Sequence, residues 1–258
     1  MSEGKVRFSR DGAIGRIVFD NPSALNALTF EMWRELGRLC KELADDKTLR
    51  VVTLRGEGGK AFLAGTDISG FLDFTSGDDG VAYEREMDSY VSAVESLPMT
   101  TIAIVEGYAV GGGLALSFAC DLRIATPDAR FGSPLGRSIG NLLSARGYAR
   151  LVAHVGIAQA KRILLLGEMV GAEQLHALGQ IHAIAPRETL DEVAAAMCKR
   201  AEENAPLTSR VSKEAIRRLT YAGLPDTDDL IRLVYGSDDF KMGVRHFLEK
   251  KDRVWTGS

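Results

Sequence analysis

The sequence predicts an α/β fold with a largely parallel sheet, and three observations predict it. Strand-like apolar segments that end at glycine, proline or acidic residues occur as "AIGRIVFDNP", "RVVTLRGEGG", "TTIAIVEG" and "DLRIA". Segments with helical spacing of apolar residues separate the first three of them, and parallel strands need such crossover connections. The C-terminal third of the chain is mostly helical in pattern. In a fold of this kind we expect ligands near the strand ends.

The elements follow one another in a regular order. The first strand stops at Asn21-Pro22, a turn dipeptide. A helix is expected after Thr29, which can cap it, because the apolar residues from Met32 onward recur at intervals of three and four. The segment "TSGDDG" at residues 75–80 is expected to form a mobile loop. Further helices are expected over "YARLVAHVGIAQAKRILLLG" and "TLDEVAAAMCKRAEENAP".

Composition excludes several classes of protein. The chain has 258 residues, of which 45% are apolar, so it can bury a substantial core. Its formal charge of −3 gives no reason to expect nucleic acid or an anionic membrane as a partner. Glu106 and several glycines interrupt the most apolar window, which argues against a membrane span. The three cysteines are widely spaced, without a CxxC motif or a nearby histidine pair, and predict neither disulfides nor a metal site. The odd number and wide spacing of the cysteines favour a reducing setting, so we expect a cytoplasmic protein. The polar start lacks the apolar segment of a signal peptide.

Two glycine-containing turns follow predicted strands. The first, "KAFLAGTDISG", places Ala64 and Gly65 before Thr66, and its simplest interpretation is a tight turn capped by Asp67. The second, "EGYAVGGGLALSFACD", places three glycines between a strand and a helix, where the amides at the helix start are free. Neither turn matches the GxxxxGK[ST] or GxGxxG phosphate-binding pattern. If each turn aims one amide at the same oxygen, the pair forms an oxyanion hole.

The order of these motifs resembles that of the crotonase superfamily, the enoyl-CoA hydratases, isomerases and their relatives. The resemblance rests on "DNPSALNALT", "FLAGTDI", "EGYAVGGGLALSFACDLRIAT", "ARFGSPLG" and "DDFKMGVRHFLEKKD", and it spans nearly the whole chain. It implies a crotonase-like spiral of ββα turns with an acyl-CoA site over residues 1–195, and a helical C-terminal trimerisation region over residues 196–258. It also implies a homotrimer or a dimer of trimers. The substrate would be a coenzyme A thioester, with no cofactor beyond the coenzyme A that the substrate carries.

The resemblance also implies roles for single residues. The amides that bind the thioester oxygen would be those of Thr66 and Gly112, and a Cβ at Gly112 would crowd the approaching thioester. Lys250 is a candidate for contact with a coenzyme A phosphate, with an ordinary solvated lysine as the alternative. The other candidate contacts to coenzyme A are Ser23, Ala24, Leu25, Ala64, Asp67 and Ile68.

The chain departs from the family pattern at the two positions where hydratases carry a glutamate, since Ala115 and Leu135 stand there. Neither side chain can activate water or deliver a proton, so the standard hydration mechanism is in doubt. Decarboxylation mainly needs stabilisation of the enolate, which an oxyanion hole alone can supply. We therefore expect an acyl-CoA-processing enzyme that stabilises a thioester enolate. An acyl-CoA decarboxylase or isomerase, and a non-catalytic acyl-CoA-binding subunit, are the alternatives.

Other polar residues close to these motifs are weaker candidates. Arg137 could orient a carboxylate on the acyl group, although it cannot act as a base at neutral pH. His154 lies in a helical segment and is expected to be a packed or surface histidine. Loop contacts or helix caps are the commoner roles of the nearby residues Ser117, Ser133, Ser138 and Asn141. The segment after the predicted loop contains Glu84, Glu86, Asp88 and Tyr90, which could close over the acyl chain. A solvated amphipathic helix is the favoured interpretation of this segment.

Overall fold

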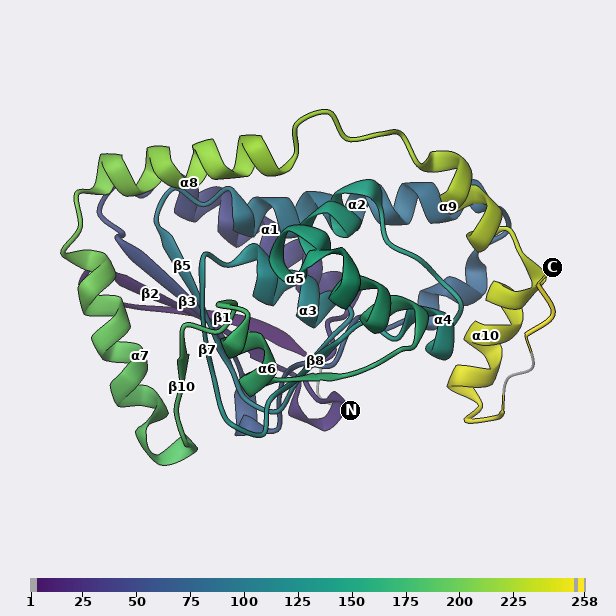
Figure 1. The fold of residues 1–258 in the computed structure, drawn as a ribbon, viewed down its shortest axis with the longest axis horizontal. Coiled ribbons are helices and arrows are strands. Elements are labelled where there is room, and N and C mark those ends of the chain that lie inside the picture. The colour runs from purple at the N-terminus through teal and green to yellow at the C-terminus, as the bar shows by residue number, and fades with distance from the viewer. Residues whose placement is uncertain (1–3, 253–254, 258) are drawn as a thin grey trace.

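The computed structural model describes residues 4–252 and 255–257, and within them the larger of two sheets has six strands (Figure 1). Their order is β1-β2-β3-β5-β7-β10, and every neighbouring pair from β2 to β10 is parallel. This arrangement confirms the predicted α/β class. The strands are β1 (Lys5–Asp11), β2 (Ile14–Asp20), β3 (Val51–Gly56), β5 (Thr100–Val105), β7 (Leu122–Ala125) and β10 (Ala183–Ile184).

A second, smaller sheet gives the fold its repeating unit. It orders β4-β6-β8-β9, with β4, β6 and β8 parallel and β9 antiparallel to β8. Successive strand pairs, β3 with β4, β5 with β6 and β7 with β8, each contribute one strand to each sheet before the chain turns into a helix. This is the predicted spiral of ββα turns. The strands are β4 (Ala61–Leu63), β6 (Tyr108–Val110), β8 (Arg130–Gly132) and β9 (Val170–Gly171).

Helices cover the sheets and fill the C-terminal third, as the sequence predicts. The short 3-10 helices are η1 (Pro22–Ala24), η2 (Glu57–Gly59) and η3 (Ser69–Asp73). The first five α-helices are α1 (Phe30–Ala44), α2 (Gly77–Glu95), α3 (Gly112–Ala119), α4 (Leu135–Ser138) and α5 (Ala145–Leu165). The last five are α6 (Ala172–Ala177), α7 (Arg187–Glu202), α8 (Pro206–Thr220), α9 (Asp228–Tyr235) and α10 (Asp238–Leu248).

The central strands of the larger sheet, β3, β5 and β7, are buried on both faces. Alternation along β3 sends Val52 and Leu54 into the main core with α1, α2 and α3, while Val51 packs against α7 on the opposite face. The α1 helix begins as predicted, because the Thr29 side chain accepts a hydrogen bond from Met32 N at 3.2 Å. The α7 helix runs without a break across positions 195 and 196, where the sequence analysis divides the chain.

The start of α2 corrects the loop predicted over residues 75–80. The helix begins at Gly77, because Asp79 accepts hydrogen bonds from the backbone amides of Thr75 and Ser76, each at 2.8 Å. The glycines serve packing: a Cβ on Gly80 would lie 2.2 Å from the ring of Tyr235 on α9. The small residues therefore let α9 approach α2 closely. Figure 1 shows α9 and α10 beside this end of α2, near the C-terminus.

Among the helices of the described residues, none is long and apolar enough to cross a membrane.

Candidate active site

The two glycine-containing turns meet in space. Gly65 has φ of 116°, and a Cβ built on it would lie 3.7 Å from the Val110 carbonyl oxygen, just before the triplet. A Cβ built on Gly112 would lie 3.2 Å from Thr66 Oγ1. The main chains at residues 65–66 and 110–112 are therefore in direct contact, although they follow different strands of the second sheet.

Neighbouring hydrogen bonds leave the amides of Thr66 and Gly112 available. Leu28 N donates to Gly65 O at 3.0 Å, and Asp67 N donates to Leu28 O at 2.8 Å. Because successive amides of extended chain point to opposite sides, Thr66 N–H points away from Leu28. Gly112 is the first residue of α3, where amides have no partner within the helix. Both residues line one cavity.

Packing explains why glycine follows glycine here. A Cβ on Gly112 would lie 3.0 Å from Trp33 Cζ2, and one on Gly113 would lie 2.2 Å from Leu63 O, a backbone atom that cannot move independently. The buried Trp33 also donates from Nε1 to Thr66 Oγ1 at 3.2 Å, which fixes the other turn. The triplet thus allows α3 to start against both β4 and the turn at Thr66.

The cavity that these turns line has a volume of about 250 Å³. Most of its wall is apolar, with contributions from α2, from the segment around α4 and from α10. Representative apolar lining residues are Phe71, Met87, Val91, Ile139, Leu142 and Phe247. An apolar chamber with two backbone amides can hold a hydrocarbon acyl group while its carbonyl oxygen meets polar donors.

The two positions at which the sequence predicts a replaced family glutamate both lie at the cavity. Ala115 is the fourth residue of α3, and Leu135 is the first residue of α4. Both line the cavity. Neither carries a proton donor or acceptor on its side chain. The cavity therefore lacks an acid or base at either of these positions.

Arg137 stands outside the cavity. Leu135 and Ser138 are three residues apart on α4 and share its inner face, so Arg137 falls on the exposed side. A Cβ on Gly167 would lie 3.3 Å from both Cβ and Cδ of Arg137, which places this side chain along the loop after α5. The structure thus does not bring the guanidinium to the candidate acyl site.

The other polar candidates divide into two groups. Ser138 and Asn141 line the cavity, and Asn141 Oδ1 is buried without a hydrogen-bond partner among the described residues. Ser117 Oγ instead donates to the Leu114 carbonyl at 2.8 Å inside α3, and Ser133 is buried behind the lining. The first two can therefore contact a ligand in this cavity directly.

His154 is a packed histidine, one of the two roles expected for it. Its ring stacks on Phe118 with centroids 4.6 Å apart, and Nδ1 lies 2.7 Å from Gln180 Oε1. Burial lowers the pKa of His154 to about 4. The side chain lines a different hollow, between α7 and α8, so it does not face the two turns.

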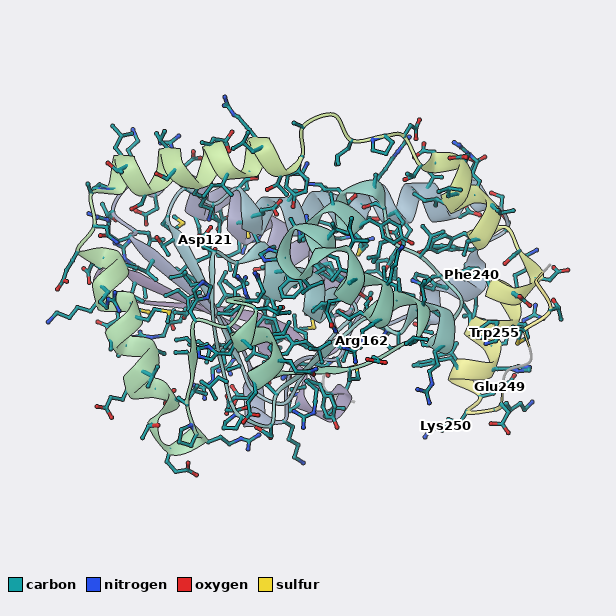
Figure 2. The ribbon with its side chains drawn as sticks, viewed as in Figure 1. Asp121, Arg162, Phe240, Glu249, Lys250 and Trp255 are labelled. Atoms are coloured by element: carbon teal, nitrogen blue, oxygen red, sulfur yellow. The ribbon has the colours of Figure 1, made fainter. Side chains whose placement is uncertain are left out.

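The candidate coenzyme A residues lie on two neighbouring loops and just after the end of α10. Ser23, Ala24 and Leu25 are exposed in and just after η1, and Leu25 O accepts from Ala64 N at 3.0 Å. Ile68 and Ala64 line the cavity. Asp67 closes its own turn, as predicted, by accepting from the Ser69 amide at 2.9 Å. In Figure 2, Lys250 lies at the tip of α10, on the outer edge of the molecule.

Glu84 is buried, which corrects the solvated helix expected for it. The side chain is only 7% exposed and lines the same cavity as Thr66 and Gly112. One carboxylate oxygen accepts from the Tyr235 hydroxyl at 2.6 Å, and the other accepts from Ser144 N at 3.2 Å. Burial raises the pKa of Glu84 to about 7. The signal was present in the sequence, since positions 77, 80, 84, 87 and 91 form one helical face, and all are buried.

Asp88, Glu86 and Tyr90, which also lie on α2, differ in whether they line the cavity. Asp88 also lines the cavity, and burial raises the pKa of its carboxyl. Glu86 accepts a hydrogen bond from Tyr90 at 2.8 Å, and neither of these side chains lines the cavity. Arg150 reaches the cavity wall, but its guanidinium is paired with Glu95 at 3.2 Å. Glu84 and Asp88 are therefore the carboxyl groups that the described residues present to this chamber.

Within residues 4–252 and 255–257, no group of three or more histidine, cysteine, aspartate and glutamate side chains is placed to hold a metal ion.

Comparison with known proteins places the whole chain in one family. The sequence profile described as enoyl-CoA hydratase/isomerase matches residues 9–258. Among curated relatives, human enoyl-CoA hydratase domain-containing protein 2, mitochondrial, is 31% identical over 255 residues, which cover 96% of this chain and 87% of the relative.

Solved structures agree with the sequence relatives. An enoyl-CoA hydratase/carnithine racemase from Magnetospirillum magneticum superimposes with a TM-score of 0.79 and 30% identity, covering 100% of this chain and 97% of its own. A methylmalonyl-CoA decarboxylase in complex with 2-nitronate-propionyl-CoA superimposes with a TM-score of 0.89 and 26% identity, covering 98% of this chain and 99% of its own. The ββα spiral, the paired turns and these matches together identify the chain as a member of the enoyl-CoA hydratase/isomerase family of enzymes.

Proposed function

We propose that this protein processes acyl-CoA thioesters by holding the thioester oxygen between the amides of Thr66 and Gly112. The observation that carries the proposal is the contact between the two turns, which leaves both amides available on one apolar cavity. Two hydrogen bonds to this oxygen stabilise negative charge there, and therefore favour an enolate over the neutral thioester. No cofactor is required for this chemistry, because coenzyme A arrives as part of the substrate.

The coenzyme A moiety would lie along the surface next to this cavity. Exposed loop residues beside the Ala64 turn suit the pantetheine and nucleotide portions of the ligand. Lys250 would reach a phosphate as a point charge. The proposed contacts are Ser23, Ala24, Leu25, Ala64, Asp67, Ile68 and Lys250. We further propose a cytoplasmic enzyme that assembles as a homotrimer or a dimer of trimers through its helical C-terminal region.

Ordinary hydration of a conjugated thioester is not the favoured reaction. It requires a base to activate water and an acid to protonate Cα, and the two usual positions hold Ala115 and Leu135. Reactions that need a stabilised enolate and little else fit the cavity better. Isomerisation of an unsaturated acyl group uses the same stabilised enolate and, in addition, a group that moves a proton from one carbon to another.

Decarboxylation of a carboxylated acyl-CoA is a second candidate, favoured by one specific observation. The methylmalonyl-CoA decarboxylase superimposes with a TM-score of 0.89 over nearly the whole of both chains. Arg137 would not orient the departing carboxylate, because its side chain lies outside the cavity. A decarboxylase of this kind would depend on the oxyanion hole and on other polar lining groups such as Asn141.

A substitution at Gly112 tests the proposal, with Gly136 as a matched control. Gly112→Ala and Gly112→Val place carbon between the two turns, whereas a Cβ on Gly136 meets nothing within 4 Å. Loss of one oxyanion donor typically lowers turnover about 100- to 1,000-fold. We expect that loss for Gly112→Val, and full activity for Gly136→Ala, on whichever thioesters the native protein converts.

The assay follows a panel of saturated, unsaturated and carboxylated CoA thioesters, with binding measured by calorimetry and folding by thermal melting. Full turnover by a folded Gly112→Val variant would contradict the assigned oxyanion hole. Binding without turnover across the panel would instead support an inert acyl-CoA-binding subunit. Failure to bind any CoA thioester would overturn the proposal as a whole.

A further inference from the structure

We propose that Glu84 is the acid-base residue of this cavity, taking a proton from the acyl chain and returning it to a carbon atom. This inference rests on the proposed function and goes beyond it, because it assigns the proton transfer that the oxyanion hole alone cannot perform. It places the catalytic carboxyl on α2, whereas the positions at which the family pattern carries glutamate lie on α3 and α4.

Geometry is the first support. Glu84 lines the cavity that Thr66 and Gly112 also line, so the residue with the carboxyl and the two residues that offer amides border one cavity. An ionised carboxylate has about four acceptor sites. The hydroxyl of Tyr235 and the amide of Ser144 use two of them, one on each oxygen. The remaining acceptor capacity is available to a C–H group of a bound acyl chain.

Rigidity is the second support. Tyr235 comes from α9 and Ser144 caps α5, so three helices hold the carboxyl in one place. Tyr235 is 1% exposed and packs on Gly80, one turn before Glu84 on α2. A carboxyl fixed from both sides keeps the orientation that proton transfer to a bound substrate needs.

The charge environment is the third support. Both hydrogen-bond partners of Glu84 are neutral groups, a phenol and a backbone amide, so neither holds the carboxyl in its charged form as a cation would. Burial and the nearby carboxylate of Asp88 raise the pKa of Glu84, while the two hydrogen bonds lower it, which leaves the pKa at about 7. The titratable groups that interact with Glu84 are Tyr83 and Asp88 of α2, Tyr148 of α5 and Tyr235 of α9.

A pKa near neutrality suits both directions of transfer. At pH 7 the ionised and the protonated forms of Glu84 are both well populated, so the group can accept a proton in one step and donate it in the next. A buried carboxyl without a cation partner destabilises the native fold at neutral pH. Function provides a reason for such a group, although buried networks also occur for structural reasons.

The proposed step balances without any further reactant. The Glu84 carboxylate takes a proton from an acidic carbon of the acyl chain, and the electron pair of that C–H bond forms the C=C bond of the enolate. The carbonyl π electrons move to the thioester oxygen, where the two amides accept the charge. When protonated Glu84 exchanges its proton with solvent, delivery of the solvent proton to the same carbon gives isotope exchange. Delivery of a proton to another carbon of a conjugated enolate shifts a double bond. The substrate class is thus an acyl-CoA with an acidic C–H bond, converted by one acid-base group.

The test measures deuterium uptake from D2O into the acyl chains of butanoyl-CoA and a 3-enoyl-CoA by mass spectrometry. Glu84→Gln keeps an acceptor for the Ser144 amide and a polar group against Tyr235, but it cannot transfer the proton. Glu86→Gln removes a carboxylate from the same helix outside the cavity. We expect the native protein to incorporate deuterium, Glu84→Gln to exchange at least 100-fold more slowly, and Glu86→Gln to match the native rate.

Two further measurements separate catalysis from structure. The native exchange rate should rise with a midpoint near pH 7 while the slow rate of Glu84→Gln does not, since the base form of Glu84 appears over that range. Glu84→Asp keeps the carboxyl and should recover part of the activity. In calorimetry, the three variants Glu84→Gln, Glu84→Asp and Glu86→Gln should bind butanoyl-CoA with affinities within about threefold of the native protein.

The outcomes distinguish the inference from the function on which it rests. Native-like exchange by Glu84→Gln would overturn the inference while leaving the oxyanion hole intact. The absence of deuterium uptake by native protein that binds both thioesters would also overturn it. In contrast, failure of the native protein to bind either thioester, or full exchange by Gly112→Val, would overturn the proposed function itself.

Discussion

Glu84 gives a stability prediction that is independent of any substrate. Its pKa is about 7 in the folded protein and 4.5 for an ordinary glutamate, so between these values the native chain holds a proton that the unfolded chain releases. The stability associated with this protonated carboxyl is fully present below pH 4.5 and is lost as pH rises through 7. The pKa difference corresponds to roughly 3 kcal/mol in the free energy of unfolding by pH 8.

Glu84→Gln removes this dependence, because glutamine is neutral at every pH in the range. Urea unfolding of the native protein and the variant at pH 5, 6, 7 and 8 gives the difference between their free energies of unfolding. We expect that difference to shift in favour of the variant by roughly 3 kcal/mol between pH 5 and 8. Glu86→Gln, with a carboxyl outside the cavity, controls for the loss of one charge from α2. A difference that stays constant with pH would refute the assigned environment of Glu84.

Three other buried positions make separate predictions. Burial lowers the pKa of His154 to about 4, so the stability associated with its neutral form is present above pH 6.5 and is lost as pH falls towards 4. Glutamine takes up no proton in this range, so His154→Gln should unfold at a lower pH than the native protein in an acid titration. Arg150→Met removes one partner of the partly buried Glu95, which keeps Arg146 and the Tyr221 hydroxyl, and should lower the free energy of unfolding by about 1 to 3 kcal/mol in urea, whereas no change would mean that this ion pair is dispensable. Gly113→Ala brings a Cβ to 2.2 Å from Leu63 O and should cost at least about 2 kcal/mol or prevent folding, and a native melting temperature would contradict the close contact between α3 and β4.

Much of the fold could be predicted because its central elements have clear local signals. The parallel strands are continuous apolar runs, and α1 has both a cap at Thr29 and an apolar stripe. β1 was missed because five of its seven residues are polar, and all but Val6 are exposed. The strands of the second sheet have only two or three residues each, too few to show a periodic pattern. Their pairing depends on contacts between segments far apart in the chain.

The candidate site could be predicted where the backbone determines it, and less well where packing determines it. The glycine-containing turns after strands have a recognisable sequence, and the resemblance to the crotonase superfamily selects Thr66 and Gly112 within them. Their role as oxyanion donors stays a prediction. The burial of Glu84 depends on Tyr235, 151 residues later, and no local pattern includes that contact. Arg137 was considered as a site residue because it follows Leu135 and its guanidinium could orient a carboxylate, whereas the register of a single helical turn directs it outward. Long-range packing therefore decides which side chains reach the cavity.

The most direct test of the central claim is the carbonyl vibration of a bound thioester. Butanoyl-CoA labelled with carbon-13 at the thioester carbonyl would be bound to the native protein and to Gly112→Val, and infrared difference spectra recorded for each. Two backbone donors weaken the C=O bond, so the account predicts a shift to lower frequency in the native complex and a much smaller shift in the variant. An unshifted carbonyl in the native complex, or an equal shift in both proteins, would contradict the assignment of Thr66 and Gly112.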